Sequence, residues 1–469
     1  MKKITFGVIV SSRGFFPISL AEQGRKDIID TLDRRGYGAV ILSEQDTPCG
    51  VVETYNDAKR CADLFRRNAD LIDGIIVVLP NFGDEVAVAD TIRLSGLNVP
   101  VLVQAYDDNV ELLDLAHRRD SFCGKLSVCN SLYQSRIRFT DTSFHTIDVN
   151  TDTFAADLDA FARVCRVVRG VRTARIGAIG ARPAAFRTVR YSEKLLQGSG
   201  ITVVTVDLSD IIAMAKGLPA GERIDEAVRE IKSYARIIDG ISDDKIIRQA
   251  RFYLAVEDWL KENERDASAI QCWTAIQENY GIASCLAMSM MGEKGMPSAC
   301  EMDVTGALTM YALQLASGEP SGYLDWNNGL AEDRNRCINI HCSNYPKSFL
   351  GADMEIGNLD IMSASIGEDI CFGACKGVIG KGNVTFAKIS TDDIRGTIKA
   401  YVGEGEFTDH PVHTPGGPGM CKVRNLQGLM KYLCANGFEH HVAMNRSLTA
   451  RVMEEAFGKY LGWEVYRHN

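Results

Sequence analysis

The sequence predicts an α/β protein with two doubly wound α/β domains that hold parallel sheets, followed by a mostly antiparallel, barrel-like β domain. Over the first part of the chain, short apolar segments alternate with amphipathic helical segments, a pattern typical of parallel sheets with right-handed crossovers. From about residue 350 onward, turn residues closely separate short β segments, which indicates an antiparallel barrel or sandwich. A length of 469 residues agrees with about three domains. We place these domains at 1–150, 151–345 and 346–469.

Strands and helices alternate regularly through the first predicted domain. In a doubly wound fold, ligands bind in the crevice outside the carboxyl ends of the strands. The loops at 11–14 and 80–83 both follow strands, so Arg13 is a candidate for binding a ligand at this edge. The strands are expected at 4–10, 39–43, 74–79 and 101–104, and the helices at 19–35, 52–68, 86–95 and 109–119.

A second α/β unit is expected to start near Asp152. Gly177 and Gly180 flank a strand end, but the full dinucleotide fingerprint and its later acid are missing, which excludes a nicotinamide site. The expected elements are helices at 157–169, ending at 196, within 210–263 and at 284–291, and strands at 174–179, 202–206 and 268–273. In the third domain, β segments are expected from 366 onward, at 378–379, at 383–390 and at 396–403.

Composition and charge exclude several classes of protein. The net charge is -9 and no basic stripe is present, so nucleic acid is not an expected partner. The apolar run at 74–80 is far shorter than the roughly 20 residues of a membrane span, so no membrane partner is expected either. The first apolar run ends at Ser11 and predicts a strand rather than a signal peptide. The 14 scattered cysteines indicate reduced thiols in a cytoplasmic protein.

Glu301 is the first candidate for chemistry. Glu301 and Asp303 lie at the entrance to an apolar, helix-like segment, where a carboxylate needs a cation or several donors. One interpretation is that both acids cap the helix that begins near Val304, because acids stabilise the positive end of a helix. The other interpretation is a metal or proton-transfer site. The segment alone leaves both open.

Histidines and a later acid extend this set. The chain has 8 histidines, and the adjacent pair His440 and His441 can place one imidazole in a site and the other behind it, since neighbours on a strand face opposite ways. With Glu301 and Asp325 they supply oxygen and nitrogen ligands without a thiolate. Such a set suits octahedral Mn²⁺ or Mg²⁺ better than a structural zinc. His341 alternates with apolar residues and, taken alone, is more typical of a core histidine than of a ligand.

These motifs resemble those of the L-fucose isomerase and L-arabinose isomerase superfamily of ketol isomerases. The resemblance lies in residues 299–309, in the segment 325–328, in the C-terminal histidine pair and in residues 270–273, and the three-part layout extends it over most of the chain. The resemblance implies a metal held by Glu301, Asp325 and His441. It leaves His341 and His440 as further possible ligands.

The resemblance implies an isomerase that interconverts an aldose and a ketose by enediol proton transfer. Glu301 and Asp325 would move the protons, and Mn²⁺, with Mg²⁺ or Co²⁺ as substitutes, would stabilise the charge on the sugar oxygens. Family members are oligomers, so we expect a homo-oligomer, a trimer or hexamer, whose sites are shared between subunits. The residues expected to bind the sugar are Arg13 from a neighbouring subunit, Gln271, Trp273, Trp326 and Asn327.

The identity of the sugar stays open at this stage, with deoxyhexoses, pentoses and sulfonated hexoses all in range. A charged substituent would need a cation, and Arg13, Arg182, Arg187 and Arg190 are the candidates. Two other functions remain. One is a carbon–carbon lyase or transferase, such as an aldolase, on the same scaffold, and the other is a sugar-binding protein without catalysis.

Overall fold

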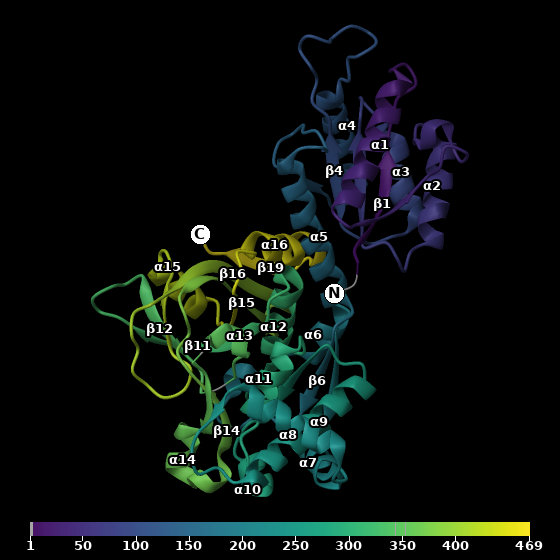
Figure 1. Cartoon of the computed structure of the whole chain (residues 1–469). Helices are drawn as coiled ribbons and strands as arrows, with labels where there is room; N and C mark the ends of the chain where they lie inside the picture. The colour runs from purple at the N-terminus through teal and green to yellow at the C-terminus, as the bar shows by residue number, and fades with distance from the viewer. Residues whose placement is uncertain (1–2, 343, 352) are drawn as a thin grey trace. The chain divides into compact units, whose positions relative to one another are not determined.

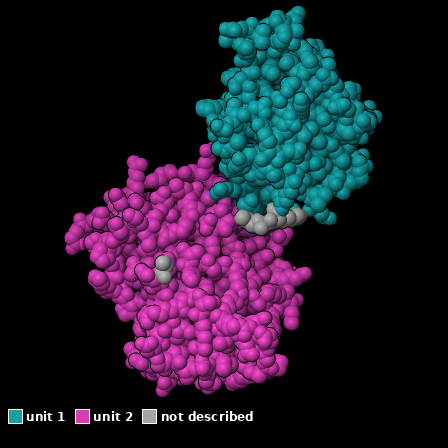
Figure 2. Space-filling model, in the orientation of Figure 1, with its two compact units in different colours: residues 1–169 teal, residues 170–469 magenta. Residues whose placement is uncertain are grey.

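The computed structural model describes residues 3–342, 344–351 and 353–469, and it divides into two compact units. Unit 1 comprises residues 1–169 and unit 2 residues 170–469 (Figure 2). The predicted division into three domains stays a prediction, and each unit is described by itself below.

Unit 1 is a doubly wound α/β domain. Its strands are β1 (Thr5–Val10), β2 (Gly38–Ile41), β3 (Gly74–Leu79), β4 (Val101–Ala105) and β5 (Thr140–Asp141). Its helices are α1 (Ile18–Arg34), the 3-10 turn η1 (Pro48–Gly50), α2 (Tyr55–Arg67), α3 (Glu85–Ser95), α4 (Ser121–Gln134) and α5 (Asp152–Arg172). The strands are parallel in the order β2-β1-β3-β4-β5. One apolar core joins the sheet to α1 and α5, and a second core joins its other face to α2, α3 and α4.

The predicted helix at 109–119 is wrong. No helix forms there, and α4 begins at Ser121. The apolar residues that favoured a helix, such as Val110 and Leu115, are 80% and 84% exposed. The Asp108 and Asp114 carboxylates instead accept hydrogen bonds from backbone N–H groups nearby. Such local bonds offer the backbone an alternative to a helix.

The first half of unit 2 holds a second parallel sheet. Its strands are β6 (Arg175–Ile179), β7 (Thr202–Val206), β9 (Ala267–Ile270) and β10 (Ser298–Ala299), in the order β10-β9-β6-β7. The helices of this part are η2 (Arg187–Val189), α6 (Glu193–Gly198), α7 (Leu208–Gly217), α8 (Glu222–Tyr234), α9 (Asp243–Glu262), α10 (Ala275–Tyr280), α11 (Cys285–Glu293) and α12 (Val304–Ser317). Two parallel α/β sheets therefore precede the β-rich part, as the sequence predicts.

The second half of unit 2 is a closed, mostly antiparallel barrel (Figure 1). Its strands are β11 (Ser321–Gly329), β12 (Arg336–Ile340), β15 (Gly382–Asp392), β16 (Thr397–Thr408), β17 (Gly419–Lys422), β18 (His441–Asn445) and β19 (Glu464–Arg467). The order is β15-β18-β11-β12-β17-β16, and β16 pairs back onto β15 to close the barrel, while β19 adds to β16 in parallel. The predicted fold class is confirmed.

Short elements complete unit 2. The β segment expected at 378–379 is wrong, because no strand forms there. The β segment expected from 366 onward starts later, at residue 372, because residues 360–366 form a helix. A small sheet is formed by β8 (Arg236–Ile237), β13 (Glu355–Asn358) and β14 (Phe372–Lys376). The remaining helical segments are α13 (Lys347–Leu350), α14 (Asp360–Ile366), η3 (Glu368–Ile370), α15 (Leu426–Ala435), α16 (Ala450–Glu454) and the π-helical η4 (Glu455–Leu461).

The helix α12 connects the two halves of unit 2, because it contacts β9 of the parallel sheet and β11, β15 and β18 of the barrel. Its close approach to β11 depends on Gly306, where an added Cβ would lie 2.1 Å from the Tyr323 hydroxyl oxygen. Within the described residues, no helix is both long enough and apolar enough to cross a membrane.

We expect Gly306→Ala to destabilise unit 2 by about 1–3 kcal/mol, because the added methyl group overpacks the contact with Tyr323. Gly217→Ala is the matched control, since open space surrounds that helical glycine. Urea unfolding followed by tryptophan fluorescence reports on unit 2, which contains all 4 tryptophans. Equal midpoints for the two variants would contradict this close packing.

Candidate active site

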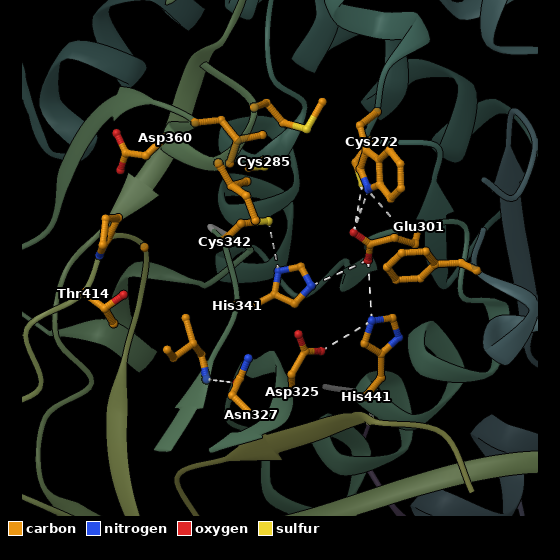
Figure 3. A pocket seen from close by; sticks show the side chains of 18 residues that line it. Cys272, Cys285, Glu301, Asp325, Asn327, His341, Cys342, Asp360, Thr414 and His441 are labelled. Atoms are coloured by element: carbon orange, nitrogen blue, oxygen red, sulfur yellow. Dashed lines mark hydrogen bonds and ion pairs between the residues drawn. The ribbon is translucent and has the colours of Figure 1, made fainter. Parts of the chain in front are cut away.

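Strand register brings three of the predicted ligands together at one end of the barrel. Asp325 on β11 pairs directly with His441, the first residue of β18. Asp325 also pairs with Ile340, the last residue of β12, and His341 follows it. Glu301 lies in the turn between β10 and α12, next to these strands (Figure 3).

The backbone at Glu301 is unusual. Glu301 and Met302 have left-handed φ angles of 52° and 58°, and such conformations cost a non-glycine residue roughly 1–3 kcal/mol. The turn directs the Glu301 side chain into the cavity, where it is only 4% exposed. Its Oε1 accepts hydrogen bonds from Trp273 Nε1 at 3.1 Å and from Cys272 Sγ at 3.4 Å. Glu301 does not cap α12, so that interpretation is wrong for this acid.

The second oxygen of Glu301 faces the imidazoles. Glu301 Oε2 lies 3.6 Å from His341 Nε2 and 3.7 Å from His441 Nε2, and Asp325 Oδ1 lies 3.5 Å from His441 Nε2 (Figure 3). Glu301 Oε2 and Asp325 Oδ1 are both buried and have no hydrogen-bond partner among the described residues. Two orphaned carboxylate oxygens that converge with imidazole nitrogens fit a hard divalent cation. The residues present therefore fit the expected metal.

The electrostatics of Glu301 and His341 follow from this proximity. Burial raises the pKa of Glu301, but the close contact and charge of His341, with the charge of His441, outweigh it and lower the pKa to about 2. Burial lowers the pKa of His341, but the close contact and charge of Glu301 outweigh it and raise the pKa to about 9. Each group thus stabilises the charged form of the other.

Asp303 has a different role from Glu301, although only one residue separates them. It is fully buried and caps α12 by accepting a hydrogen bond from the Gly306 N–H at 2.8 Å. The same carboxylate lies 2.6 Å from Lys388 Nζ and 3.0 Å from His441 Nδ1, and it accepts a hydrogen bond from the Tyr323 hydroxyl. Asp303 therefore orients His441 so that Nε2 faces the cavity. Burial raises the pKa of Asp303, but the charge of Lys388 and the bond to His441 outweigh it, and the pKa lies far below its usual value.

The structure brings some of the other predicted residues to the cavity. Trp273 and Asn327 line it. His440 lies beside it, with Nε2 3.9 Å from Asp325 Oδ1, and burial lowers the pKa of this histidine. The position of His441 Nε2 between Glu301 and Asp325 favours His441 over His440 as the ligand.

Gln271 and Trp326 lie elsewhere. Gln271 Oε1 accepts a hydrogen bond from the Ala181 N–H at 2.9 Å, and neither Gln271 nor Trp326 is among the residues that line the cavity. Trp326 follows Asp325 on β11, so it points to the opposite face, where its indole donates to the Tyr401 hydroxyl at 3.0 Å. Their predicted contacts with a sugar stay predictions.

The candidate arginines also lie outside the cavity lining. Arg13 belongs to unit 1, where it pairs with Glu85 and stacks over the Phe82 ring at 4.2 Å. Arg182 donates to the Pro183 carbonyl at 2.8 Å, and Arg190 to the Arg187 carbonyl at 2.8 Å. The predicted entry of Arg13 from a neighbouring subunit stays a prediction.

The cavity has a volume of 720 Å³, which is large enough for a monosaccharide. Sequence reasoning missed several of the residues around it. Phe186 lines the cavity and packs edge-on against Trp273, and Leu359, Ile361 and Met362 form an apolar wall. No spacing rule connects these residues to Glu301, because different loops supply them. The lining residues are Phe186, Cys272, Trp273, Cys285, Glu301, Asp325, Asn327, Ile340, His341, Cys342, Leu359, Asp360, Ile361, Met362, Thr414, Pro415, Gly416 and His441.

Two protein-family models match this chain. The model of the fucose/sulfoquinovose isomerase N-terminal domain matches residues 7–172, and that of the L-fucose isomerase C-terminal domain matches residues 339–469. The chain belongs to the fucose isomerase superfamily. The resemblance predicted from the sequence motifs is thereby confirmed.

Among curated proteins, the chain is similar to enzymes named sulfoquinovose isomerase. One from Alkalicoccus urumqiensis is 31% identical over 39% of this chain and 42% of its own length. Another, from Priestia aryabhattai, is 28% identical over 38% of this chain and 40% of its own length. The matched segment thus spans about two fifths of these relatives. A solved structure from Pyrococcus horikoshii OT3 aligns with 68% of this chain and 65% of that chain, at 14% identity and a TM-score of 0.20, too low to support an inference.

We expect Asp303→Asn to cost about 3–5 kcal/mol, because it leaves the buried Lys388 ammonium without its counter-ion. Asp409→Asn is the matched control: Asp409 is 84% exposed, so its loose pair with Lys381 should contribute less than about 1 kcal/mol. Urea unfolding measures both. Adding Lys388→Met to Asp303→Asn should recover part of the loss, and similar midpoints for the two single variants would contradict a structural role for the ion pair.

Proposed function

We propose that this protein is a metal-dependent sugar isomerase that interconverts an aldose and a ketose. The observation that carries the proposal is the convergence of two orphaned carboxylate oxygens, Glu301 Oε2 and Asp325 Oδ1, on His441 Nε2 beside a cavity of monosaccharide size. Membership of the fucose isomerase superfamily supports the same chemistry.

Glu301, Asp325 and His441 would hold the cation. His441 belongs to two groups of close ligand atoms, one with Glu301 and His341 and the other with Asp325 and His440, so His341 is within reach as a further ligand. Oxygen and nitrogen ligands without thiolates favour Mn²⁺, with Mg²⁺ or Co²⁺ as substitutes. When bound, the cation supplies Lewis-acid stabilisation of the negative charge that develops on the sugar oxygens.

The residues of this chain would carry out the proton transfer. A carboxylate beside C1 and C2 of the sugar removes a proton from one carbon and returns it to the other, and Glu301 and Asp325 would divide the carbon and oxygen proton transfers. Trp273 and Cys272 hold Oε1 of Glu301, which leaves Oε2 to face the cavity that would hold the cation and the sugar. Asp303 holds Nδ1 of His441, which leaves Nε2 for the cation.

Two classes of sugar each have an observation in their favour. The described residues that line the cavity include three acids and neither Lys nor Arg, which favours an uncharged aldose. The relatives named sulfoquinovose isomerase favour a sulfonated hexose. A sulfonate would need a cation from outside this lining. The candidates are Arg13 from a neighbouring subunit of a trimer or hexamer, Arg182, Arg187 and Arg190. A cytoplasmic location is part of the same proposal.

We expect Glu301→Gln to lower kcat by about a hundredfold or more, because the amide can neither accept the carbon-bound proton nor replace a charged ligand. The measurement is exchange of the C2 proton of the substrate with deuterated water, with a chelator and after Mn²⁺ is restored. Glu319→Gln, at an exposed position, is the matched control. Exchange that survives both chelation and Glu301→Gln would rule out the proposed site. Carbon–carbon cleavage products would identify a lyase, and binding without turnover would identify a sugar-binding protein.

Ionic strength distinguishes the two classes of sugar. An uncharged aldose should react with a kcat/KM that is insensitive to salt. A sulfonated hexose should react with a kcat/KM that falls as the salt concentration rises. Its sulfonate depends on a cationic side chain from outside the cavity lining, and salt screens the attraction between the two charges. A sulfonated hexose that reacts at a rate independent of salt would contradict this electrostatic argument.

A further inference from the structure

We propose that Cys272, Cys300 and Glu301 form a second cation site, which binds a thiophilic divalent ion such as Zn²⁺ or Cd²⁺. Each residue offers one ligand atom, the three atoms lie within 4.8 Å of one another, and all three residues are buried. Occupation of this site inhibits the isomerase, and that consequence rests on the proposed function.

The distance between Cys272 and Glu301 suits a tetrahedral ion. Cys272 Sγ lies 3.4 Å from Glu301 Oε1. An ion with a Zn–S bond of about 2.3 Å and a Zn–O bond of about 2.1 Å would separate these two atoms by roughly 3.6 Å. For this pair, a shift of a few tenths of an ångström therefore converts the present hydrogen bond into shared coordination. The Cys300 thiol, whose sulfur lies within 4.8 Å of the other two ligand atoms, supplies the third ligand.

Glu301 links this thiol site to the imidazole site. Its Oε1 faces the thiol of Cys272, while Oε2 faces His341 and His441. In Figure 3, Cys272 and His441 lie on opposite sides of the Glu301 carboxylate. A cation held on the thiol side draws on the same carboxylate that the proposed reaction needs, so the two cations compete for Glu301.

Ligand chemistry separates the two sites. Thiolates select softer ions such as Zn²⁺ and Cd²⁺, whereas carboxylates and imidazoles accept Mn²⁺ and Mg²⁺. Binding at the thiol site replaces the two thiol protons with the ion and releases both protons to solvent, without any oxidation. Cys272 and Glu301 line the cavity, which provides the path for the ion.

The test is a Cd²⁺ titration of the full chain, followed by the ultraviolet absorbance of the cadmium–thiolate bond. The exposed Cys123 and Cys434 are replaced by serine in every sample, so that they do not bind the ion. We expect one tight Cd²⁺ per chain with the absorbance of two thiolates. Cys272→Ser and Cys300→Ser should each halve this absorbance and weaken binding at least tenfold, and Cys337→Ser, at another buried thiol of unit 2, should change neither.

X-ray absorption at the cadmium edge, measured on the protein that carries only the Cys123 and Cys434 replacements, makes the test independent of how well the Cys272 and Cys300 variants fold. Two sulfur ligands per bound Cd²⁺ support the proposal. Absence of sulfur ligands, or an absorbance unaffected by both Cys272→Ser and Cys300→Ser, overturns it.

Inhibition is measured separately, as the Zn²⁺ concentration that halves isomerase activity at saturating Mn²⁺. We expect Cys300→Ser to raise this concentration at least tenfold, and an unchanged value overturns the inhibitory role. Cadmium–thiolate absorbance in a protein without isomerase activity would refute the proposed function and leave the thiol site standing. Isomerase activity in a protein that lacks this absorbance would support the proposed function and refute the thiol site.

Discussion

The buried carboxylate of Asp303 is the interaction on which unit 2 depends. It accepts a hydrogen bond from the first turn of α12, pairs with Lys388 on β15, and contacts Tyr323 on β11 and His441 on β18. One charge thus ties the helix that contacts the parallel sheet to three strands of the barrel. A buried carboxylate is stable only when its desolvation is offset by such partners, so these elements can pack in few other ways.

The same arrangement positions the side chains that face the cavity. Asp303 fixes the Nδ1 side of His441, strand pairing places Asp325 beside it, and the left-handed turn at Glu301 brings a second carboxylate to the same imidazole. The strain in that turn is offset by the packing around it, which is typical of functional sites. Asp303 and Glu301 therefore have different roles. The Asp303 carboxylate is held by Lys388, His441 and the first turn of α12, whereas Glu301 keeps one oxygen without a hydrogen-bond partner for the proposed chemistry.

Periodic features of the fold were predictable, whereas tertiary contacts were not. Alternating apolar strands and amphipathic helices predicted both parallel sheets, and closely spaced turns predicted the barrel. The helix at 109–119 was wrong because its apolar residues face solvent and its aspartates form local turns. Glu301, Asp325 and His441 were recognisable as a motif. The roles of Asp303 and Lys388 were not, since 85 residues separate this pair in sequence and only folding reveals it.

The claim that Glu301, Asp325 and His441 hold a divalent cation is tested most directly by crystals grown with Mn²⁺ and measured at the manganese absorption edge. The account predicts an anomalous peak between Glu301 Oε2, Asp325 Oδ1 and His441 Nε2, which Glu301→Gln removes. A well-ordered site without a peak at saturating Mn²⁺, or a peak bound only by other residues, would contradict it.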